Sequence, residues 1–446
     1  MVRFLYILCF SLFSFTGAIA QSQFMLHSKK TNEKIKFKLI NNLIVFPVEV
    51  NGVELSFLLD TGVSKPIIFN ILNVSDSLKI KNTETIFLRG LGEGASIEAL
   101  KSKNNVLKIG DAIKIDQDLY AIYDKALDFT PKLGVPIHGI IGFDILKDFI
   151  VEINYSKQFL KLHKPYTFIY KECKTCEIFN LEFHNNKPYM YGMLHNNGKN
   201  TPVKLLIDTG GSDALWLFED EEKGITPGEY YFDDFLGHGL NGSVYGKRSK
   251  VDAFSLKHFN LKHVNVAYPN AESIVFNNMM QDRNGSISGN ILRRFNLIID
   301  YGRAKITLKR NSNFKKRFSY NKSGIIVEYS GYRFVKTESK DVEIKGKGFD
   351  NSVAPSYVAS NNFEISLKPA YAIVELREGS PAEEAGLQKG DIILNINGKS
   401  THNFSLQQIT QFFHGETGKT IKLAVDRKGV KRTFSFRLAN PFNKKT

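Results

Sequence analysis

Phe57-Leu-Leu-Asp60-Thr61-Gly62-Val-Ser64 has a close copy later in the chain, Leu205-Leu-Ile-Asp208-Thr209-Gly210-Gly-Ser212. Each copy is an apolar strand that runs into an Asp-Thr-Gly turn. The glycine lets the backbone turn sharply, and a carboxylate buried at the end of a strand costs free energy unless it has a partner or a use. Two such carboxylates facing each other can share one proton and hold a water molecule. The repeated stretch therefore indicates a hydrolytic site.

The sequence around each copy repeats as well, so an internal duplication organises most of the chain. A predicted hairpin leads into each Asp-Thr-Gly, over residues 43–59 in the first half and 189–207 in the second. A glycine-rich bend and then a closing segment follow in the same order: 90–94 and 139–149, then 237–242 and 285–295. Short alternating strands with Gly and Asn turns, and only one short helix per half, predict two mainly β lobes.

A polar, basic connector at residues 309–320 separates these halves from a third unit. The third unit combines predicted strands with a short helix. Ser380, Pro381 and Glu383 mark the start of that helix as a capping box with proline at the first helical position. Residues 331–369 show no clean period, and we expect them to form a hairpin insertion.

The N-terminal residues have the pattern of a targeting segment. Arg3 precedes an apolar run over residues 4–15, and Ala18-Ile-Ala20 ends it at the spacing of a signal-peptidase site. We predict that residues 1–20 are a signal peptide and that the mature chain is exported to the periplasm or the medium. An uncleaved anchor is the alternative. No later stretch is long and apolar enough for an integral membrane span.

The net charge of +15 is spread along the 446 residues, and no nucleic-acid motif with interleaved aromatic residues is apparent. Nucleic acid is therefore not an expected partner. Cys9 falls in the signal peptide, which leaves Cys173 and Cys176. This pair is expected to form a loop-closing disulfide or to remain as two free thiols, because a zinc site needs more ligands than are nearby.

Residues 35–310 resemble the two lobes of an aspartic peptidase of the pepsin and retropepsin class. The resemblance rests on the paired Asp-Thr-Gly turns, the glycine-rich bends and the closing segments, in the same order in both halves. It implies two retropepsin-like acid-protease β-barrel lobes, at residues 21–165 and 166–312, with Asp60 and Asp208 as the catalytic pair between them. One acid would act as general base on a shared water and the other would polarise the scissile carbonyl, without metal or organic cofactor.

The same resemblance implies roles for neighbouring residues. Thr61 and Thr209 would join the two active-site loops by hydrogen bonds, and Gly62 and Gly210 would permit the turns. The glycine-rich bends would be flaps that cover an extended peptide, with the following residues expected at the substrate: Gly90, Leu91, Gly92, Gly237, His238 and Gly239.

Two positions depart from the pepsin pattern. Pepsin-like enzymes often have Ser or Thr after Asp-Thr-Gly, whereas this chain has Val63 and Gly211. Losing a hydroxyl donor to the ionised form should raise the pKa values of the acids, so we predict a working pH nearer neutral than pepsin's. In the closing segments, Gly142 has Ser288 as its counterpart, and serine is small enough for tight packing.

Residues 313–440 resemble a PDZ domain of the bacterial envelope-protease kind, most specifically over residues 379–398. By analogy, a peptide C-terminus would bind by β-augmentation to the loop and strand formed by Ser323, Gly324, Ile325 and Ile326. The alternative is a PDZ fold used only for docking within the molecule.

These features predict an exported aspartic endopeptidase acting on proteins or peptides, with a PDZ domain for substrate recruitment or regulation. The alternative is a catalytically silent envelope scaffold that binds peptides. Because both Asp-Thr-Gly turns lie in one chain, we expect an active monomer, although lobes from two chains could also pair as retropepsins do. The sequence leaves open whether residues 21–34 form a propeptide that must be removed.

Overall fold

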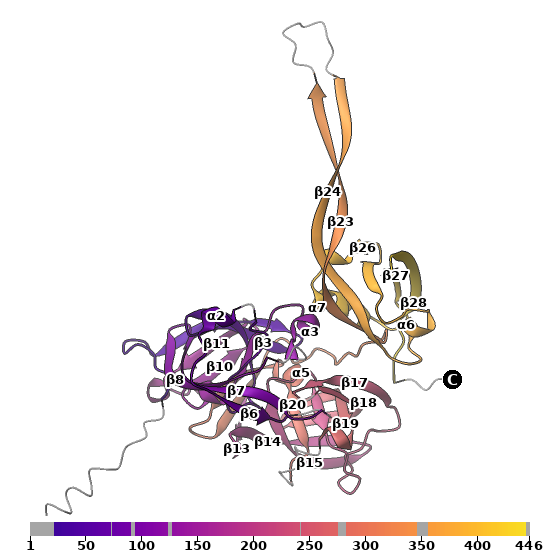
Figure 1. Ribbon diagram of the computed structural model, residues 1–446. Helices are drawn as coiled ribbons and strands as arrows, with labels where there is room; N and C mark the ends of the chain where they lie inside the picture. The colour runs from indigo at the N-terminus through magenta and orange to yellow at the C-terminus, as the bar shows by residue number, and fades with distance from the viewer. Residues whose placement is uncertain are drawn as a thin grey trace, which may run out of the picture.

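The fold is that of a computed structural model, which describes residues 22–442 apart from 73, 91–93, 124–126, 241, 275–281 and 346–355. The expected signal peptide, residues 1–20, lies outside the described residues. Within them the chain forms four β-sheets (Figure 1). The molecule is mainly β, which confirms the fold class expected from the sequence.

The first lobe is an eight-stranded sheet with the order β2-β3-β4-β9-β5-β8-β7-β6, and β3 also pairs with β7, so the sheet folds back on itself. Its strands are β2 (Lys38–Ile40), β3 (Leu43–Val50), β4 (Val53–Leu59), β5 (Ile67–Ile68), β6 (Thr83–Leu88), β7 (Ile97–Ile109), β8 (Ala112–Ala121) and β9 (Gly139–Ile141). Its helices are α2 (Ser75–Leu78), α3 (Thr130–Leu133) and α4 (Phe143–Leu146). The expectation of one helix is wrong for this lobe: Pro131 in the first turn and a left-handed Gly134 at the end allow α3 to form.

The second lobe repeats this topology strand for strand, with the order β13-β14-β15-β20-β16-β19-β18-β17 and an additional pairing of β14 with β18. Its strands are β13 (Glu182–His184), β14 (Lys187–Asn196), β15 (Lys199–Asp208), β16 (Leu215–Leu217), β17 (Phe232–Gly239), β18 (Gly242–Leu256), β19 (Phe259–Pro269) and β20 (Gly285–Ser288). Its helices are α5 (Gly289–Leu292) and a 3-10 turn, Ala271–Ser273.

A six-stranded sheet joins the two lobes, with the order β1-β11-β10-β21-β22-β12. Its strands are β1 (Asn32–Lys36), β10 (Ile150–Asn154), β11 (Phe159–His163), β12 (Cys176–Asn180), β21 (Phe295–Asp300) and β22 (Lys305–Arg310). The lobes meet where β10 and β21 run antiparallel, with Val151 opposite Ile299. A disulfide joins Cys173 to Cys176 where β12 begins.

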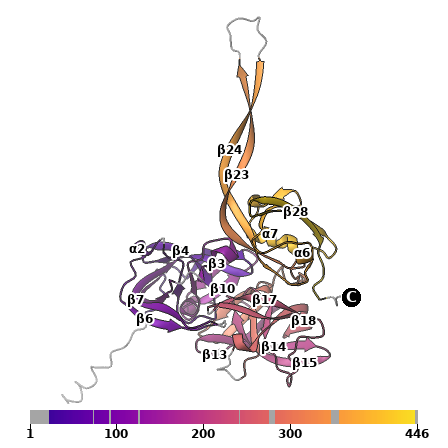
Figure 2. The same cartoon turned by 45° about the vertical axis from the view of Figure 1, so that its right-hand side comes forward.

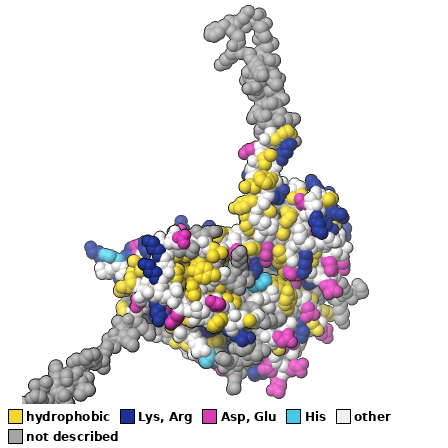
Figure 3. Space-filling view, in the orientation of Figure 1, with side chains coloured by type: hydrophobic (Ala, Val, Ile, Leu, Met, Phe, Trp, Pro, Cys, Tyr) yellow, Lys and Arg dark blue, Asp and Glu magenta, His cyan; other side chains and the backbone are white. Residues whose placement is uncertain are grey.

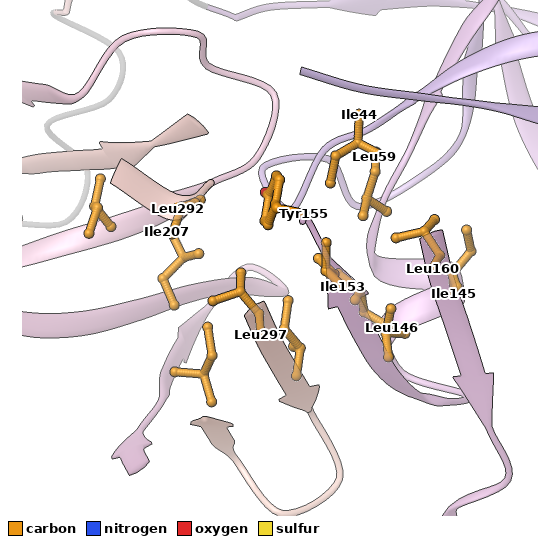
Figure 4. Packing of buried hydrophobic residues seen from close by; sticks show 14 of the residues in the cluster. Ile44, Leu59, Ile145, Leu146, Ile153, Tyr155, Leu160, Ile207, Leu292 and Leu297 are labelled. Carbon is orange, nitrogen blue, oxygen red and sulfur yellow. The ribbon is translucent and has the colours of Figure 1, made fainter. Parts of the chain in front are cut away.

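One continuous apolar core runs through both lobes and this shared sheet. Figure 4 shows Leu59 of the first lobe and Ile207 of the second on either side of Ile153 and Leu297, which come from the shared sheet. The lobes are therefore held together by packing as well as by strand pairing. These two interactions fix the position of one lobe relative to the other without any contribution from the loops.

The C-terminal unit has its own sheet, β23-β24-β25-β27-β28, with β26 paired to β25, and its own apolar core. Its elements are β23 (Ile325–Lys345), β24 (Ser356–Leu376), α6 (Pro381–Glu384), β25 (Ile392–Ile396), β26 (Lys399–Ser400), a 3-10 turn (Thr401–Asn403), α7 (Leu406–Phe413), β27 (Thr420–Arg427) and β28 (Val430–Arg437). The Ser380 hydroxyl accepts from the Glu383 N–H, while the Glu383 carboxylate accepts from Gly379 and not from Ser380.

Strands β23 and β24 continue beyond this sheet as a long hairpin that projects from the molecule (Figures 1 and 2). Residues 331–345 and 356–369, which belong to the expected insertion, are its outer part, and residues 346–355 lie outside the described residues. Phe334 pairs with Leu367, and two pairs away Tyr332 lies opposite Pro369, so these side chains share one face of the ribbon. Figure 3 shows apolar side chains along this exposed ribbon.

The N-terminal segment is part of the fold. Phe24 and Leu26 are buried in the core, and the Phe24 N–H donates to Asp148 at 2.9 Å. Strand β1 then pairs along its whole length with β11. A cut after residue 34 would therefore remove core side chains and most of an edge strand, so residues 22–34 have a structural role in this conformation.

We predict that Phe24→Ala lowers the free energy of unfolding by about 3 kcal/mol, because the substitution leaves a cavity at a buried aromatic site. The neighbouring residue gives a matched control: Met25 is 56% exposed against 5% for Phe24. Met25→Ala should change stability by less than about 0.5 kcal/mol. Urea unfolding followed by circular dichroism measures both. Equal effects of the two substitutions would contradict the structural role of this segment.

Candidate active site

Each Asp-Thr-Gly turn sits at the end of a buried strand that a second strand supports from the side. Strand β4 pairs in parallel with β9, and β15 with β20. The Asp60 N–H donates to Ile141 in β9 at 2.9 Å, and Asp208 is the last residue of β15. The closing segments identified in the sequence thus fix the backbone of both turns.

Two threonines join the turns by reciprocal hydrogen bonds. The Thr61 N–H donates to the Thr209 hydroxyl at 3.0 Å, and the Thr209 N–H donates to the Thr61 hydroxyl at 3.1 Å. Each hydroxyl in turn donates across the interface, Thr209 to Leu59 and Thr61 to Ile207. Both threonines are 1% exposed, so no water competes for these bonds.

This arrangement brings the two acids together. The Gly62 N–H donates to Asp60 at 2.6 Å, and the Gly210 N–H donates to Asp208 at 3.0 Å. A Cβ atom placed on Gly210 would lie 2.4 Å from the Asp60 carboxyl carbon, so the second turn presses directly against the first acid. Glycine is needed at position 210 because there is no space for a side chain.

The two departures from the pepsin pattern prove to be connected in the second lobe. A Cβ atom on Gly211 would lie 2.7 Å from the Ser288 hydroxyl and 2.8 Å from an Asp208 oxygen. Gly211 therefore makes room for Ser288. In the first lobe, a Cβ on Gly142 would lie 1.8 Å from the Asp60 carbonyl oxygen, so a serine cannot replace Gly142 in that geometry.

The environments of the two acids differ. Burial, and then the negative charge of Asp208, raise the pKa of Asp60 to about 7. Burial raises the pKa of Asp208 as well, but the positive charge of Arg283, the N–H groups of Gly210 and Gly211 and the charge of Lys187 oppose it. More groups stabilise the ionised form of Asp208, which favours Asp60 as the acid that holds the shared proton.

The sequence analysis missed Lys187 and Arg283. Burial, and then the charge of Arg283, lower the pKa of Lys187, while the charges of Asp60 and Asp208 oppose that shift. Burial also lowers the pKa of Arg283, and the charge of Asp208 opposes it. A comparison of the two halves position by position would have shown both cations, because they stand where the first half has apolar residues.

The two flaps meet at their ends. A Cβ atom on Gly90, which follows β6, would lie 2.7 Å from Cβ of Leu240 in the β17–β18 turn. Leu240 packs against an apolar cluster of the first lobe. Leu91 and Gly92 lie outside the described residues. Gly239 pairs with Gly242 at the end of the second hairpin.

Within that hairpin, a register shift lies between Phe235 and Gly237, and Gly237 has φ 151°, which favours glycine. His238 contacts another aromatic ring of the same hairpin. Its ring lies 4.7 Å from that of Phe235, and burial, together with the charge of Lys132 in α3, lowers its pKa to about 4, against the charge of Glu375 in β24.

Comparison with known proteins agrees with this geometry. Residues 46–145 match the aspartyl protease family, and residues 373–427 match the PDZ domain family. The chain carries an aspartyl protease domain and a PDZ domain.

Several curated proteins, among them the following three, are similar to parts of the chain. The carboxy-terminal processing protease CtpA of Bacillus subtilis is 30% identical over 86 residues, 19% of this chain and 18% of its own length. A probable CtpA-like serine protease of Staphylococcus haemolyticus is 30% identical over 81 residues, 18% of this chain and 16% of its own length. A putative zinc metalloprotease of Lactococcus lactis, LL2128, is 27% identical over 135 residues, 27% of this chain and 31% of its own length. The chain spans less than a third of each, and their names include other protease classes.

The loop expected to receive a peptide in the PDZ domain is already engaged within the chain. The Asn321 side-chain oxygen accepts from the N–H groups of Ser323 at 3.0 Å and Gly324 at 3.2 Å. The Ser323 hydroxyl accepts from the Ile325 N–H at 3.0 Å, and Ile326 pairs with β24. A peptide carboxylate would therefore have to compete with the Asn321 side chain.

Helix α3 of the protease domain lies against the PDZ strand β23, which is an edge strand, and also against α7 (Figure 1). Gln407 at the start of α7 donates to the Leu133 carbonyl at 2.7 Å, and the charge of Glu328 in β23 acts on Lys132. The side of the PDZ domain on which an added strand would pair thus contacts the first lobe.

A buried chain of charges links the second active-site loop to the connector before the PDZ domain. Arg248 pairs with Asp213, five positions after Asp208, at 2.8 Å and with Asp234 in β17 at 3.4 Å. The Tyr320 hydroxyl donates to Asp234 at 2.5 Å. The active-site loop, a flap strand and the connector therefore share one polar network.

Among the residues that the structure describes, no group of three or more His, Cys, Asp or Glu gathers as metal ligands would. In the same part of the chain, no helix combines the length and apolar character needed to cross a membrane.

We predict that Asp60→Asn stabilises the protein at pH 8. A carboxyl whose pKa is higher in the folded state costs stability once the pH exceeds its unfolded value, and this cost grows until the folded pKa, about 7, is passed. Asparagine carries no such cost and keeps the acceptor for the Gly62 N–H. The difference from the parent should grow between pH 4 and pH 7 and then level off. Thermal unfolding measures it, with exposed Asp116→Asn as control; a difference independent of pH would contradict the raised pKa.

Proposed function

We propose that this protein is an exported aspartic endopeptidase that hydrolyses peptide bonds with a water molecule activated between Asp60 and Asp208. The observation that carries the proposal is the reciprocal bonding of Thr61 and Thr209, which sets two half-buried acids against each other in unequal environments. An acid with a raised pKa beside an ionised one is the combination that general acid–base hydrolysis needs.

The unequal environments assign the roles. Asp208, ionised, takes a proton from the water as the water oxygen bonds to the scissile carbonyl carbon. Asp60, protonated, donates to the carbonyl oxygen and so neutralises the charge that develops there. The tetrahedral intermediate then breaks its carbon–nitrogen bond, the proton held by Asp208 passes to the leaving amine, and the new carboxyl group returns a proton to Asp60.

The alternative function is a silent scaffold that binds peptides in the cell envelope. Such a protein would gain nothing from two acids whose pKa values are raised at a cost in stability. The aspartyl protease match and the similarity to named proteases also favour the enzyme.

The proposal includes export by residues 1–20, action as a monomer, and a PDZ domain that recruits or regulates. The signal-like sequence and the disulfide between Cys173 and Cys176 support export. Both acids belong to one chain, which supports a monomer. The contact of α3 with the PDZ domain and the network through Arg248 support regulation, because both would respond to movement of that domain.

The test uses the chain without residues 1–20, incubated with denatured proteins from pH 3 to pH 9, with new termini mapped by mass spectrometry. Either Asp60→Asn or Asp208→Asn should lower cleavage by more than about a thousandfold. Activity should fall as the pH rises past about 7, where Asp60 loses its proton. Asp116→Asn, on the surface, is the control for loss of a carboxylate.

Two outcomes would contradict the proposal. A folded monomer that cuts nothing at any pH would favour the scaffold. Cleavage with a maximum below about pH 3 would contradict the raised pKa of Asp60 and the expected working pH near neutral, since acids with few donors titrate higher than that. Light scattering on the same samples gives the molecular mass.

A further inference from the structure

The two lobes place equivalent residues beside the acids. The turns Asn41-Asn42 and Asn185-Asn186 have the same left-handed backbone, with φ 48° and 70° in the first and 49° and 64° in the second. Each turn begins the strand that pairs with the acid-bearing strand. The next residue is Leu43 in the first lobe and Lys187 in the second.

Each turn also contacts the active-site loop of the opposite lobe. The Asn42 side chain donates to the Ser212 carbonyl at 2.6 Å, and the Ser64 hydroxyl donates to the Asn185 carbonyl at 3.0 Å. Leu43 and Lys187 are therefore held next to the catalytic loops on opposite sides of the interface.

A second equivalent pair comes from the strands that support the acids. Strands β9 and β20 begin at Gly139 and Gly285, which pair with equivalent positions of β4 and β15. Two residues earlier, the first lobe has Ile137 and the second has Arg283.

In the first lobe these positions belong to the apolar core. Leu43, Phe69 and Ile137 are 7%, 1% and 0% exposed and belong to one cluster with Val45 and Leu58. Leu240 from the opposite flap packs against the same cluster. This side of the acids is suited to an apolar side chain.

In the second lobe the same positions are cationic. Lys187 and Arg283 are both half-buried. The Arg283 Nε donates to the Gly285 carbonyl at 3.0 Å, and its guanidinium carbon lies 5.2 Å from the ring centre of Phe218, the counterpart of Phe69. One nitrogen and one face of the guanidinium are thus held by the protein, which fixes the group in place.

The nearby acids are engaged elsewhere. Glu182 and Asp282 both pair with Lys204, at 2.5 Å and 2.7 Å. Among the described residues, no acidic side chain forms an ion pair with Lys187 or Arg283. The catalytic acids supply one negative charge between them, so two cations leave one positive charge without compensation beside the reaction centre.

We propose that Lys187 and Arg283 form a cationic subsite that binds a carboxylate of the substrate beside the scissile bond, whereas the equivalent side of the first lobe is apolar. Consecutive side chains of an extended peptide point to opposite sides, so the two residues that flank the cut enter different lobes. The preferred sequence joins an apolar residue to an acidic one. The carboxylate belongs to an Asp or Glu side chain or to the C-terminus of a short leaving fragment. This inference rests on the proposed peptidase function.

The test compares four peptides with the chain lacking residues 1–20. Two are amidated at the C-terminus and differ only in Glu or Gln next to the cut. Two have Gln at that position and end at that residue, with a free or an amidated C-terminus. Preference for the Glu peptide assigns the site to a side chain, and preference for the free C-terminus assigns it to a terminal carboxylate.

The variants copy the first lobe: Lys187→Leu and Arg283→Ile. Each should lower the preference in kcat/KM for the carboxylate peptide over its neutral partner by about tenfold or more, the size of one charge-assisted contact. Cleavage of the neutral peptides is the reference: a loss common to charged and neutral peptides reports the effect of the cation on the acids and leaves the preference unchanged. Lys187→Arg should keep the preference, and Lys262→Leu, which removes an exposed lysine of β19, should not alter it.

Binding separates this inference from the catalytic proposal. Asp60→Asn removes a neutral acid and keeps the charge of Asp208, so calorimetry in that background tests the subsite without cleavage. Tighter binding of a carboxylate peptide, lost in Lys187→Leu, supports the subsite even if the parent cuts nothing, which would overturn only the peptidase. Equal binding and cleavage of charged and neutral peptides would overturn the subsite and leave the peptidase standing. A shifted pH profile with unchanged preference would also overturn it, because the cations would then act only on the acids.

Discussion

The reciprocal hydrogen bonds between Thr61 and Thr209 are the interaction on which the rest of the site depends. They hold two loops from opposite lobes back to back, and this brings Asp60 and Asp208 into one buried space. The shared sheet makes those bonds possible, since β10 and β21 pair the lobes before the loops meet. Any side chain on Gly210 would enter the space of the first acid. The buried contact between Thr61 and Thr209 therefore holds the two lobes together and also positions the two acids.

The two lobes have the same topology, but the electrostatic environments of Asp60 and Asp208 differ. Topology is the same in both lobes, yet the second lobe adds positive charge where the first is apolar. In a space with little water these charges act strongly on their neighbours. Lys187 and Arg283 favour the ionised form of Asp208, and this separates the roles of two acids that symmetry alone would leave equivalent. In the proposed subsite, the charges of Lys187 and Arg283 also favour binding of a carboxylate.

The PDZ domain and the connector before it both contact the aspartyl protease domain. Helix α3 contacts its edge strand and α7, and the chain from Asp213 through Arg248 to Tyr320 reaches its connector. A buried ion network of this kind holds its partners in one arrangement, because separating any member leaves a charge without compensation. The network therefore ties the connector before the PDZ domain to strand β17 of the second flap and to the loop that follows Asp208.

The sequence by itself determined the two lobes, the acids and the PDZ domain, because an Asp-Thr-Gly turn with its hairpin and closing segment is a local pattern that occurs twice in register. Only the tertiary structure decided what depends on pairing between distant segments. The shared sheet joins β10 to β21, and α3 meets the PDZ domain, neither of which has a local signal. A comparison of the two halves shows Lys187 and Arg283 as cations in place of apolar residues, but only the tertiary structure brings these two residues, distant in sequence, to the neighbourhood of Asp208. Local sequence patterns therefore predict the individual strands and turns. The arrangement of the site depends on burial and on pairing between segments that are far apart in the sequence.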